Sequence, residues 1–248
     1  MLHPLAQQFA GVAEVYDLGR PGYPPEAITI AAREFELHAR DRVADLGAGT
    51  GKLTTALVGA GLDVVAVEPL DQMRERLAAA LPAIEVVAAT AERLPFADGA
   101  LAACFSADAF HWFEPDAAAA ELHRVLRPGG GVALLWHLPG WETEPPAWWS
   151  KLAELLNSIR TGHPGFAGEQ GREGFARHGG FEPFSHHVVR SSFATDRERL
   201  LAYVQSISYV AGHPERDRVL DEVRAIVRDV EPHESPVRTD MWLTRRQP

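Results

Sequence analysis

Short apolar runs alternate with amphipathic segments over the middle of this 248-residue chain. Near-continuous apolar runs predict buried strands, whereas apolar residues three to four positions apart predict helices that cover a sheet. The runs predict strands at 42–47, 63–69, 84–90, 100–108 and 130–138, separated by helices at 52–61, 70–82 and 115–130. This alternation is typical of a parallel, doubly wound α/β sheet.

The pattern changes on both sides of this core. Residues 1–40 predict a helical lead-in interrupted by prolines, and 162–174 predict a glycine-rich loop. After Pro139 the sequence predicts helices at 147–159, 196–210 and 214–230 and strands at 184–195 and 235–246. We therefore expect a single domain over 1–248, with an N-terminal lid (1–40), a core (41–138) and a C-terminal part (139–248) whose strands enclose a helical insertion at about 196–232.

Composition and charge exclude several classes of protein. The formal net charge is −10 and the arginines are scattered among acids, which disfavours binding to nucleic acid. The sequence contains neither a long uncharged apolar run nor a signal peptide, so we expect no membrane association and a cytoplasmic location. The lone cysteine, Cys104, lies in an apolar run and is expected to be an inert core thiol in a reducing compartment.

The stretch VADLGAGTGKLT, residues 43–54, places three glycines directly after a strand. Turns of this kind hold nucleotide-like ligands. A phosphate-binding P-loop would need Ser or Thr after Gly51-Lys52, but Leu53 follows. A dinucleotide-binding turn would be G-x-G-x-x-G, whereas this chain has G-x-G-x-G. The glycines alone therefore leave the ligand open.

Two acidic residues narrow the choice of ligand. Asp45 ends the first strand, where its carboxylate would oppose a pyrophosphate but suits the ammonium and sulfonium of S-adenosylmethionine. Glu68 ends the second strand, where a carboxylate can accept both hydroxyls of a ribose. The plainer alternatives are that Asp45 braces the turn and that Glu68 is an exposed strand-end residue.

Four segments in this order and spacing resemble class I S-adenosylmethionine-dependent methyltransferases: residues 43–54, 65–73, 90–113 and 121–136, with VYDLGRPGYP before them. The small-molecule branch, which includes ubiquinone/menaquinone-type and trans-aconitate-type enzymes, is the most similar. The resemblance implies a Rossmann-like, mostly parallel seven-stranded sheet with an antiparallel last strand and a helical cover. It also implies S-adenosyl-L-methionine as cofactor and S-adenosyl-L-homocysteine as product.

The resemblance assigns parts of the cofactor to particular residues. The methionine moiety is expected near the glycine turn, the ribose on Glu68, the adenine between the 70–73 segment and the 90–92 loop, and the methionine carboxylate under the N-terminal lid. Thr90 stands where many relatives carry an Asp for the adenine amino group, so either Thr90 or Glu92 would have to serve. The expected cofactor residues are Asp45, Gly47, Ala48, Gly49, Glu68, Pro69, Leu70, Met73, Thr90, Ala91, Glu92, Ser106, Tyr16 and Arg20.

Methyl transfer from a sulfonium needs mainly positioning and exclusion of water, so no catalytic triad is required. His111 and His137 follow strands and are candidate bases, although each could equally serve structure. The expected acceptor pocket comprises Tyr23, Asp108, Trp112, Phe113, Trp136 and Trp141. His186 and His187 face opposite sides of a strand, and no spacing of ligands indicates a metal.

The sequence thus predicts an enzyme that methylates an oxygen, nitrogen or carbon of a small organic molecule and acts as a monomer or homodimer. One alternative is an NAD(P)-dependent oxidoreductase, which Asp45 and the absence of a Y-x-x-x-K arrangement disfavour. Another is a non-catalytic regulatory protein that binds S-adenosylmethionine.

Overall fold

The computed structural model describes residues 4–143, 145–160 and 172–248, and the chain divides into two compact units. The larger unit comprises Gly22–Trp136, Pro164–Val189 and Thr239–Pro248. The smaller unit comprises Met1–Pro21, His137–His163 and Arg190–Arg238. The expectation that all of these segments act as one domain stays a prediction.

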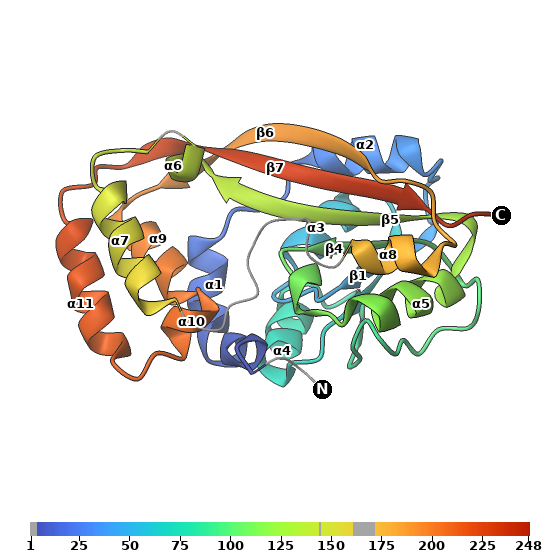
Figure 1. The fold of residues 1–248 in the computed structure, drawn as a ribbon, viewed down its shortest axis with the longest axis horizontal. Helices are drawn as coiled ribbons and strands as arrows, with labels where there is room; N and C mark the ends of the chain where they lie inside the picture. Colours follow the sequence, from blue (N-terminus) through green and yellow to red (C-terminus); the bar gives the residue numbers. More distant parts are fainter. Residues whose placement is uncertain (1–3, 144, 161–171) are drawn as a thin grey trace. The chain divides into compact units, whose positions relative to one another are not determined.

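The strands form one seven-stranded sheet in the order β3-β2-β1-β4-β5-β7-β6 (Figure 1). The neighbours from β3 to β5 are parallel, and the β5-β7-β6 end is antiparallel. The predicted fold class is therefore confirmed. The strands are β1 (Arg42–Leu46), β2 (Asp63–Val67), β3 (Glu85–Val87), β4 (Leu101–Ala107), β5 (Leu126–Pro139), β6 (Ser185–Thr195) and β7 (His233–Arg245).

In the larger unit, helices cover both faces of the sheet because successive strand residues point to opposite sides. The helices α2 (Pro25–Glu34) and α3 (Lys52–Gly59) pack on the face that carries Val43, Ala103 and Ala133. The helices α5 (Pro115–Val125) and α8 (Glu173–His178) pack on the opposite face. The unit also contains α4 (Asp71–Ala80) and the short 3-10 helix η2 (Phe110–Trp112).

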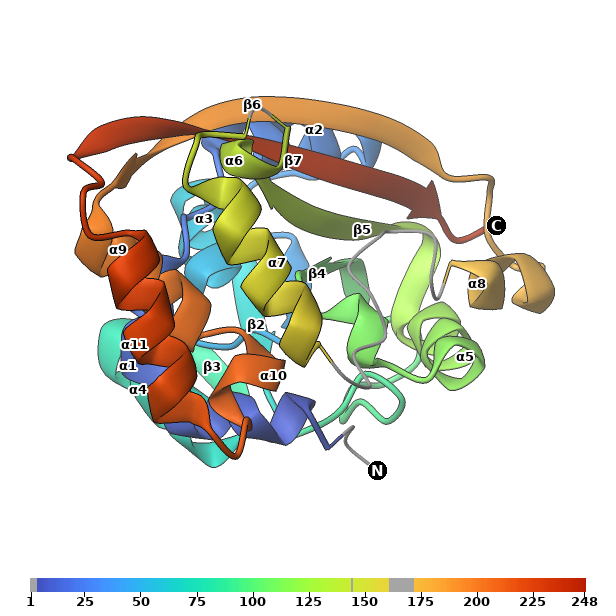
Figure 2. The same cartoon turned by 60° about the vertical axis from the view of Figure 1, so that its left-hand side comes forward.

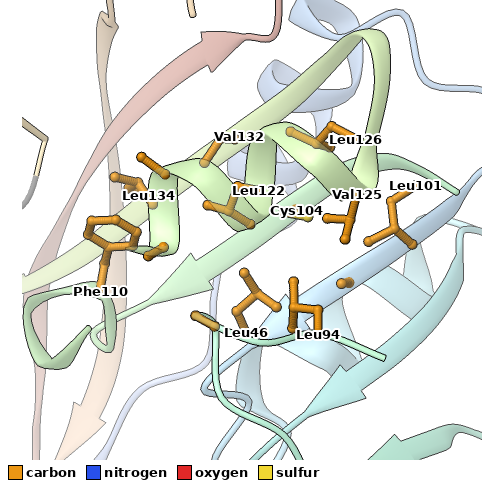
Figure 3. Packing of buried hydrophobic residues seen from close by; sticks show 14 of the residues in the cluster. Leu46, Leu94, Leu101, Cys104, Phe110, Leu122, Val125, Leu126, Val132 and Leu134 are labelled. Carbon is orange, nitrogen blue, oxygen red and sulfur yellow. The ribbon is translucent and has the colours of Figure 1, made fainter. Parts of the chain in front are cut away.

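Figure 3 shows the core beneath α5, where Leu122 and Val125 lie against residues of β4 and β5. Cys104 lies in this core, and burial raises the pKa of its thiol, in keeping with a packing role. Each fully buried Leu or Val side chain of this kind contributes about 1.5–3 kcal/mol. The apolar strands predicted from the sequence are thus the centre of the packed unit.

In the smaller unit, α11 (Arg216–Ile226) lies beside α7 (Trp149–Ile159) and α9 (Arg197–Gln205) (Figure 2). This unit has a hydrophobic core of its own, which joins Trp141, Leu152, Leu200 and Val219. The backbone at Gly19 approaches that of Tyr203 so closely that a Cβ on Gly19 would lie 2.2 Å from the Tyr203 nitrogen. The elements of this unit outside the sheet are η1 (Ala6–Val12), α1 (Ala13–Gly19), α6 (Gly140–Thr143), α7 (Trp149–Ile159), α9 (Arg197–Gln205), α10 (Ser208–Ala211) and α11 (Arg216–Ile226).

The structure differs from the predicted elements in several places, among them β3, which is only Glu85–Val87 where 84–90 was predicted. Strand β5 begins at Leu126, earlier than the predicted 130, because Pro128 disfavours continuing α5 and leaves Leu126 extended. The predicted helix 196–210 is two helices, α9 and α10. Helix α8 begins within the predicted loop 162–174, most of which lies outside the described residues.

In the described parts of the chain, no helix combines the length and apolarity needed to cross a bilayer.

Replacing Gly131 in β5 by Ala should destabilise the fold, because the new Cβ would lie 2.2 Å from a ring carbon of Phe35. We expect the midpoint of thermal unfolding to fall by roughly 3–10 °C, since overpacking a core costs about 1–3 kcal/mol. Gly59→Ala is the matched control, because no described atom lies within 4 Å of its added Cβ. Circular dichroism melts would contradict this account if both variants melted like the wild type.

Candidate functional site

The turn after β1 is built from residues in the left-handed region of backbone space. Gly47 and Gly49 have φ values of +66° and +56°, which favour glycine. The amides of Gly47 and Ala48 both donate to the carbonyl of Val67, which ties the turn to the end of β2. A Cβ on Gly47 would lie 2.7 Å from that of Ala109, whereas one on Gly49 would meet no described atom within 4 Å. The turn is therefore packed at Gly47 and open at Gly49.

Asp45 lies at the end of β1 with only 1% of its surface exposed. Its Oδ2 accepts a hydrogen bond of 2.6 Å from the hydroxyl of Thr54 on α3. Burial raises the pKa of Asp45 from 3.8 to about 7. The hydrogen bonds from Thr54 oppose this shift, and the nearby charge of Glu68 contributes to it. Asp45 thus braces the turn, as the plainer alternative expected, and is also a carboxylate poised to ionise near neutral pH.

Glu68 is buried rather than exposed, so the interpretation of a solvated strand-end residue is wrong. Its Oε2 accepts from the amide of Gly49 and its Oε1 from the amide of Leu70, each at 2.9 Å. Burial raises the pKa of Glu68, although the two amides oppose the shift. Because a carboxylate oxygen has two lone pairs, each can still accept a ligand hydroxyl.

Asp108 follows β4, the strand beside β1, and is held in an unusual conformation. It has φ +49°, uncommon for a residue other than glycine, and its amide donates to the carbonyl of Leu135 at 2.9 Å. The hydroxyl of Tyr23 donates to Asp108 Oδ2 at 2.7 Å. The structure therefore brings these two predicted pocket residues together.

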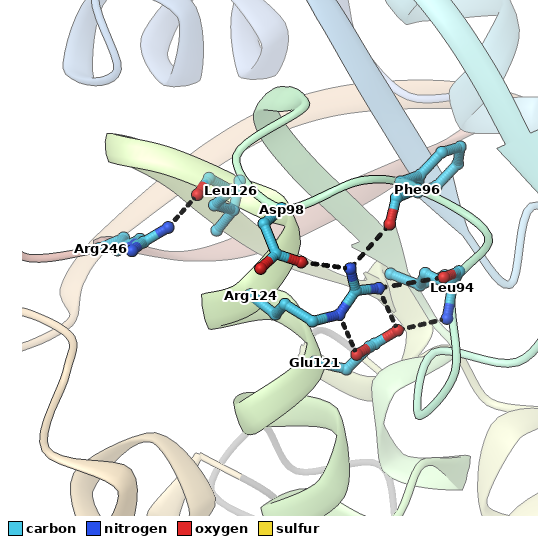
Figure 4. A network of polar contacts seen from close by, with 7 residues as sticks. All are labelled: Leu94, Phe96, Asp98, Glu121, Arg124, Leu126 and Arg246. Carbon is cyan, nitrogen blue, oxygen red and sulfur yellow. Dashed lines mark hydrogen bonds and ion pairs between the residues drawn. The ribbon is translucent and has the colours of Figure 1, made fainter.

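The loop from Thr90 to Asp98 is fastened to α5 by a network around Arg124 (Figure 4). The Arg124 guanidinium donates to the carbonyls of Leu94 and Phe96 and to the carboxylates of Asp98 and Glu121. These hydrogen bonds hold the pKa of Glu121 below its ordinary range. The network fixes the loop on which the adenine was expected.

Glu92, on the same loop, accepts a hydrogen bond of 2.9 Å from the amide of Glu114 at the start of α5. One oxygen of its carboxylate is thus used for structure. Thr90 forms a bridge with Arg93 and Ala91 is buried. Met73 is buried on α4, and Leu70 precedes this helix. Whether these residues contact an adenine stays a prediction.

Buried hydroxyls without a partner lie near the carboxyl ends of β1 and β4. In the described part of the chain, the hydroxyls of Thr50 and Ser106 accept or donate no hydrogen bond, although both residues are at least 95% buried. The indole N–H of the buried Trp136 on β5 is likewise unpaired there. Such groups are costly unless a ligand or water satisfies them.

The segment after Asp108 carries three of the predicted residues. His111 and Trp112 lie in η2 with ring centroids 4.7 Å apart, and both are partly exposed. The ring of Phe113 packs edge-on against Phe110 at 5.2 Å. The structure gives these side chains a defined place but tests no catalytic role for His111.

Pro69, which follows Glu68, belongs to the larger unit, whereas four other predicted residues belong to the smaller unit. Arg20 lies over the rings of Tyr203 and Tyr16, at 4.3 and 5.5 Å, and its Nε donates to the hydroxyl of Ser206 at 2.9 Å. Trp141 packs among Trp148, Trp149 and Tyr203, and His137 is on β5. The roles predicted for Tyr16, Arg20, His137 and Trp141 remain predictions.

Sequence reasoning missed the partners of several residues. Thr54 was not recognised as the partner of Asp45, although a hydroxyl in the first turn of α3 was a usable signal. His186 bonds Asp240 at 2.7 Å and stacks on Trp242, a pairing across strands that no local pattern indicates. Among the described residues, no group of three or more His, Cys, Asp or Glu side chains could hold a metal ion.

Comparison with known proteins identifies the class. Residues 44–134 match the family described as "Methyltransferase domain". An uncharacterized methyltransferase of Mycobacterium tuberculosis strain H37Rv is 38% identical over 229 residues, which cover 90% of this chain and 86% of that protein. The demethylmenaquinone methyltransferase of Mycolicibacterium vanbaalenii is 36% identical over 140 residues, which cover 53% of this chain and 59% of that protein.

The fold of this chain is also similar to solved structures. The phosphoethanolamine N-methyltransferase 2 of Haemonchus contortus, in complex with S-adenosyl-L-methionine, superimposes with a TM-score of 0.56 at 15% identity, covering 97% of this chain and 56% of that one. At this identity the likeness shows the fold alone. The sequence relatives carry the assignment: this chain belongs to the methyltransferase family and is a class I enzyme that catalyses methyl transfer.

Replacing Asp45 by Asn should stabilise the protein above neutral pH. Asp45 has a pKa of about 7 in the folded state and an ordinary pKa of 3.8 in the unfolded state. Between these pH values the folded state binds more protons than the unfolded state, so the free energy of unfolding falls as the pH rises. Asn stays uncharged and can still accept from Thr54. We expect the thermal midpoint of Asp45→Asn to exceed that of the wild type by roughly 2–8 °C at about pH 8 and by less at about pH 5.

The control is Asp63→Asn, an exposed carboxylate at the start of β2. Its difference from the wild type should be small at both pH values. A gain for Asp45→Asn that did not depend on pH would contradict an ionising, buried Asp45.

Proposed function

We propose that the methyl donor is S-adenosyl-L-methionine, that the product is S-adenosyl-L-homocysteine, and that the acceptor is a small organic molecule. The proposed donor is supported chiefly by two buried carboxylates at the glycine turn: Glu68, which accepts from the amide of the open Gly49, and Asp45, which accepts from the hydroxyl of Thr54. The donor carries an ammonium, a sulfonium and a ribose, and two carboxylates suit each of these groups.

The available contacts indicate how the donor would be held. Glu68 would accept the ribose hydroxyls through the lone pairs that its two amide contacts leave. Ionised Asp45 would attract the positive charge of the methionine moiety. When bound, the donor supplies an activated methyl group, so the protein has only to orient the acceptor and keep water out.

The alternatives are not favoured. A nicotinamide dinucleotide would bring a pyrophosphate to a turn flanked by Asp45 and Glu68, where like charges repel. A protein that only binds the donor would differ from relatives that are named methyltransferases over most of this chain. An acceptor of small size is supported by the demethylmenaquinone methyltransferase among the relatives.

Calorimetric titration with S-adenosyl-L-methionine tests the donor. We expect micromolar affinity for the wild type and a loss of about 10-fold or more for Glu68→Gln, because the Gln amide group would face the backbone N–H of Gly49 or Leu70. Asp63→Asn should bind like the wild type. Binding of NADH, or of neither ligand, would overturn the proposed donor.

The affinity for S-adenosyl-L-methionine should also depend on pH. Asp45 has a pKa of about 7, so it is protonated in acid and no longer attracts a cationic ligand. We expect the affinity to drop about 10-fold or more between about pH 7.5 and about pH 5.5, and Asp45→Asn to be weak at both. A wild-type affinity that did not change over this interval would remove Asp45 from the donor site.

A further inference from the structure

Three neighbouring strands of the larger unit each end in a carboxylate. Asp45 ends β1, Glu68 follows β2 and Asp108 follows β4, and these strands are adjacent in the order β2-β1-β4. In an open α/β sheet, the order reverses between β1 and β4, and ligands bind at the carboxyl ends of the strands at that point. The donor accounts for Asp45 and Glu68. Asp108 is the third acid at this edge of the sheet and has no role in holding the donor.

Asp108 is fixed beside the glycine turn. The next residue, Ala109, lies so close to Gly47 that only a glycine fits there. The bond from the Asp108 amide to Leu135 and the left-handed backbone at Asp108 hold the carboxylate at this point rather than in the run of β4. Strained backbone of this kind is retained where function requires it.

Tyr23 orients the carboxylate from a different part of the chain. Its ring packs against the core beneath α2, and its hydroxyl donates to Asp108 Oδ2 at 2.7 Å. This hydrogen bond orients the Asp108 carboxylate and uses a lone pair of one of its two oxygens.

The buried hydroxyls nearby point independently to a ligand. Ser106 is two residues before Asp108, and Thr50 is next to Gly49; both are buried and, among the described residues, unpaired. Together with the carboxylates, they make this edge of the larger unit polar and negatively charged, and rich in hydrogen-bond acceptors.

We propose that Asp108, held by Tyr23, receives the methyl acceptor by accepting a hydrogen bond from its nucleophilic O–H or N–H group. The acceptor is therefore an alcohol, a phenol or an amine, and not a carboxylate. A nucleophile that donates its hydrogen to Asp108 keeps a lone pair for the methyl group, and its proton passes to Asp108 as the methyl–sulfur bond breaks. An acceptor carboxylate has no hydrogen to donate and is repelled by the Asp108 carboxylate. This inference rests on the proposed donor.

Three matched fragments test the inference: benzyl alcohol, benzylamine and benzoate, which share one ring and differ in charge and hydrogen-bonding group. Their binding to the full-length protein saturated with S-adenosyl-L-homocysteine is measured by saturation-transfer NMR. We expect the alcohol and the amine to bind at millimolar concentration and benzoate to bind at least about 10-fold more weakly. Asp108→Asn should bring benzoate to within about threefold of the alcohol, and Tyr23→Phe should give an intermediate preference.

Asp63→Asn is the control for removal of one carboxylate and should keep the wild-type preference. Equal binding of benzoate to the wild-type complex, binding of none of the three fragments, or a preference unchanged in Asp108→Asn would overturn the inference. Calorimetry with S-adenosyl-L-homocysteine precedes the fragments, so a failure of the donor is seen separately. Circular dichroism melts of both variants exclude misfolding as the cause.

Discussion

A carboxylate buried at the end of the first strand sets the conditions for the whole donor site. Asp45 is removed from water, and an ionised carboxylate is costly in such a place, although the hydroxyl and the backbone N–H of Thr54 partly compensate it. The surrounding structure must therefore hold α3, the glycine turn and Glu68 in place around it. The cationic donor proposed above would relieve this unfavourable burial, and it would then link the stability of the fold to the chemistry of the site.

The order of the strands turns this local constraint into a site. Because β1 lies between β2 and β4, the ends of three strands, with Asp45, Glu68 and Asp108, come together on one edge. Glu68 closes the turn through the amides of Gly49 and Leu70, and Arg124 fastens the next loop to α5. Rigid backbone contacts thus position the polar groups, and the apolar core beneath α5 supports them.

The strands, the glycine turn and the acids at the strand ends could be predicted from the sequence, because the pattern that indicates each lies within a short segment of the chain. Apolar runs gave the strands, and the spacing of glycines after VADL gave the turn, since few other residues accept a positive φ. The acids at the ends of the first two strands could be recognised in the same way. Two features were harder to predict from local patterns. Helix α5 ends before Pro128, earlier than predicted, and Glu92 accepts a hydrogen bond from the amide of Glu114 at the start of α5.

The sequence by itself determined the class of fold, the glycine turn and the identity of the strand-end acids, because each depends on residues close together in the chain. Only the tertiary structure decided that Thr54 braces Asp45, that both oxygens of Glu68 accept backbone amides, and that Tyr23 reaches Asp108 across 85 positions. Such pairings depend on how strands and loops are ordered in space. Burial, which follows from that order, then raises the pKa of Asp45 and of Glu68.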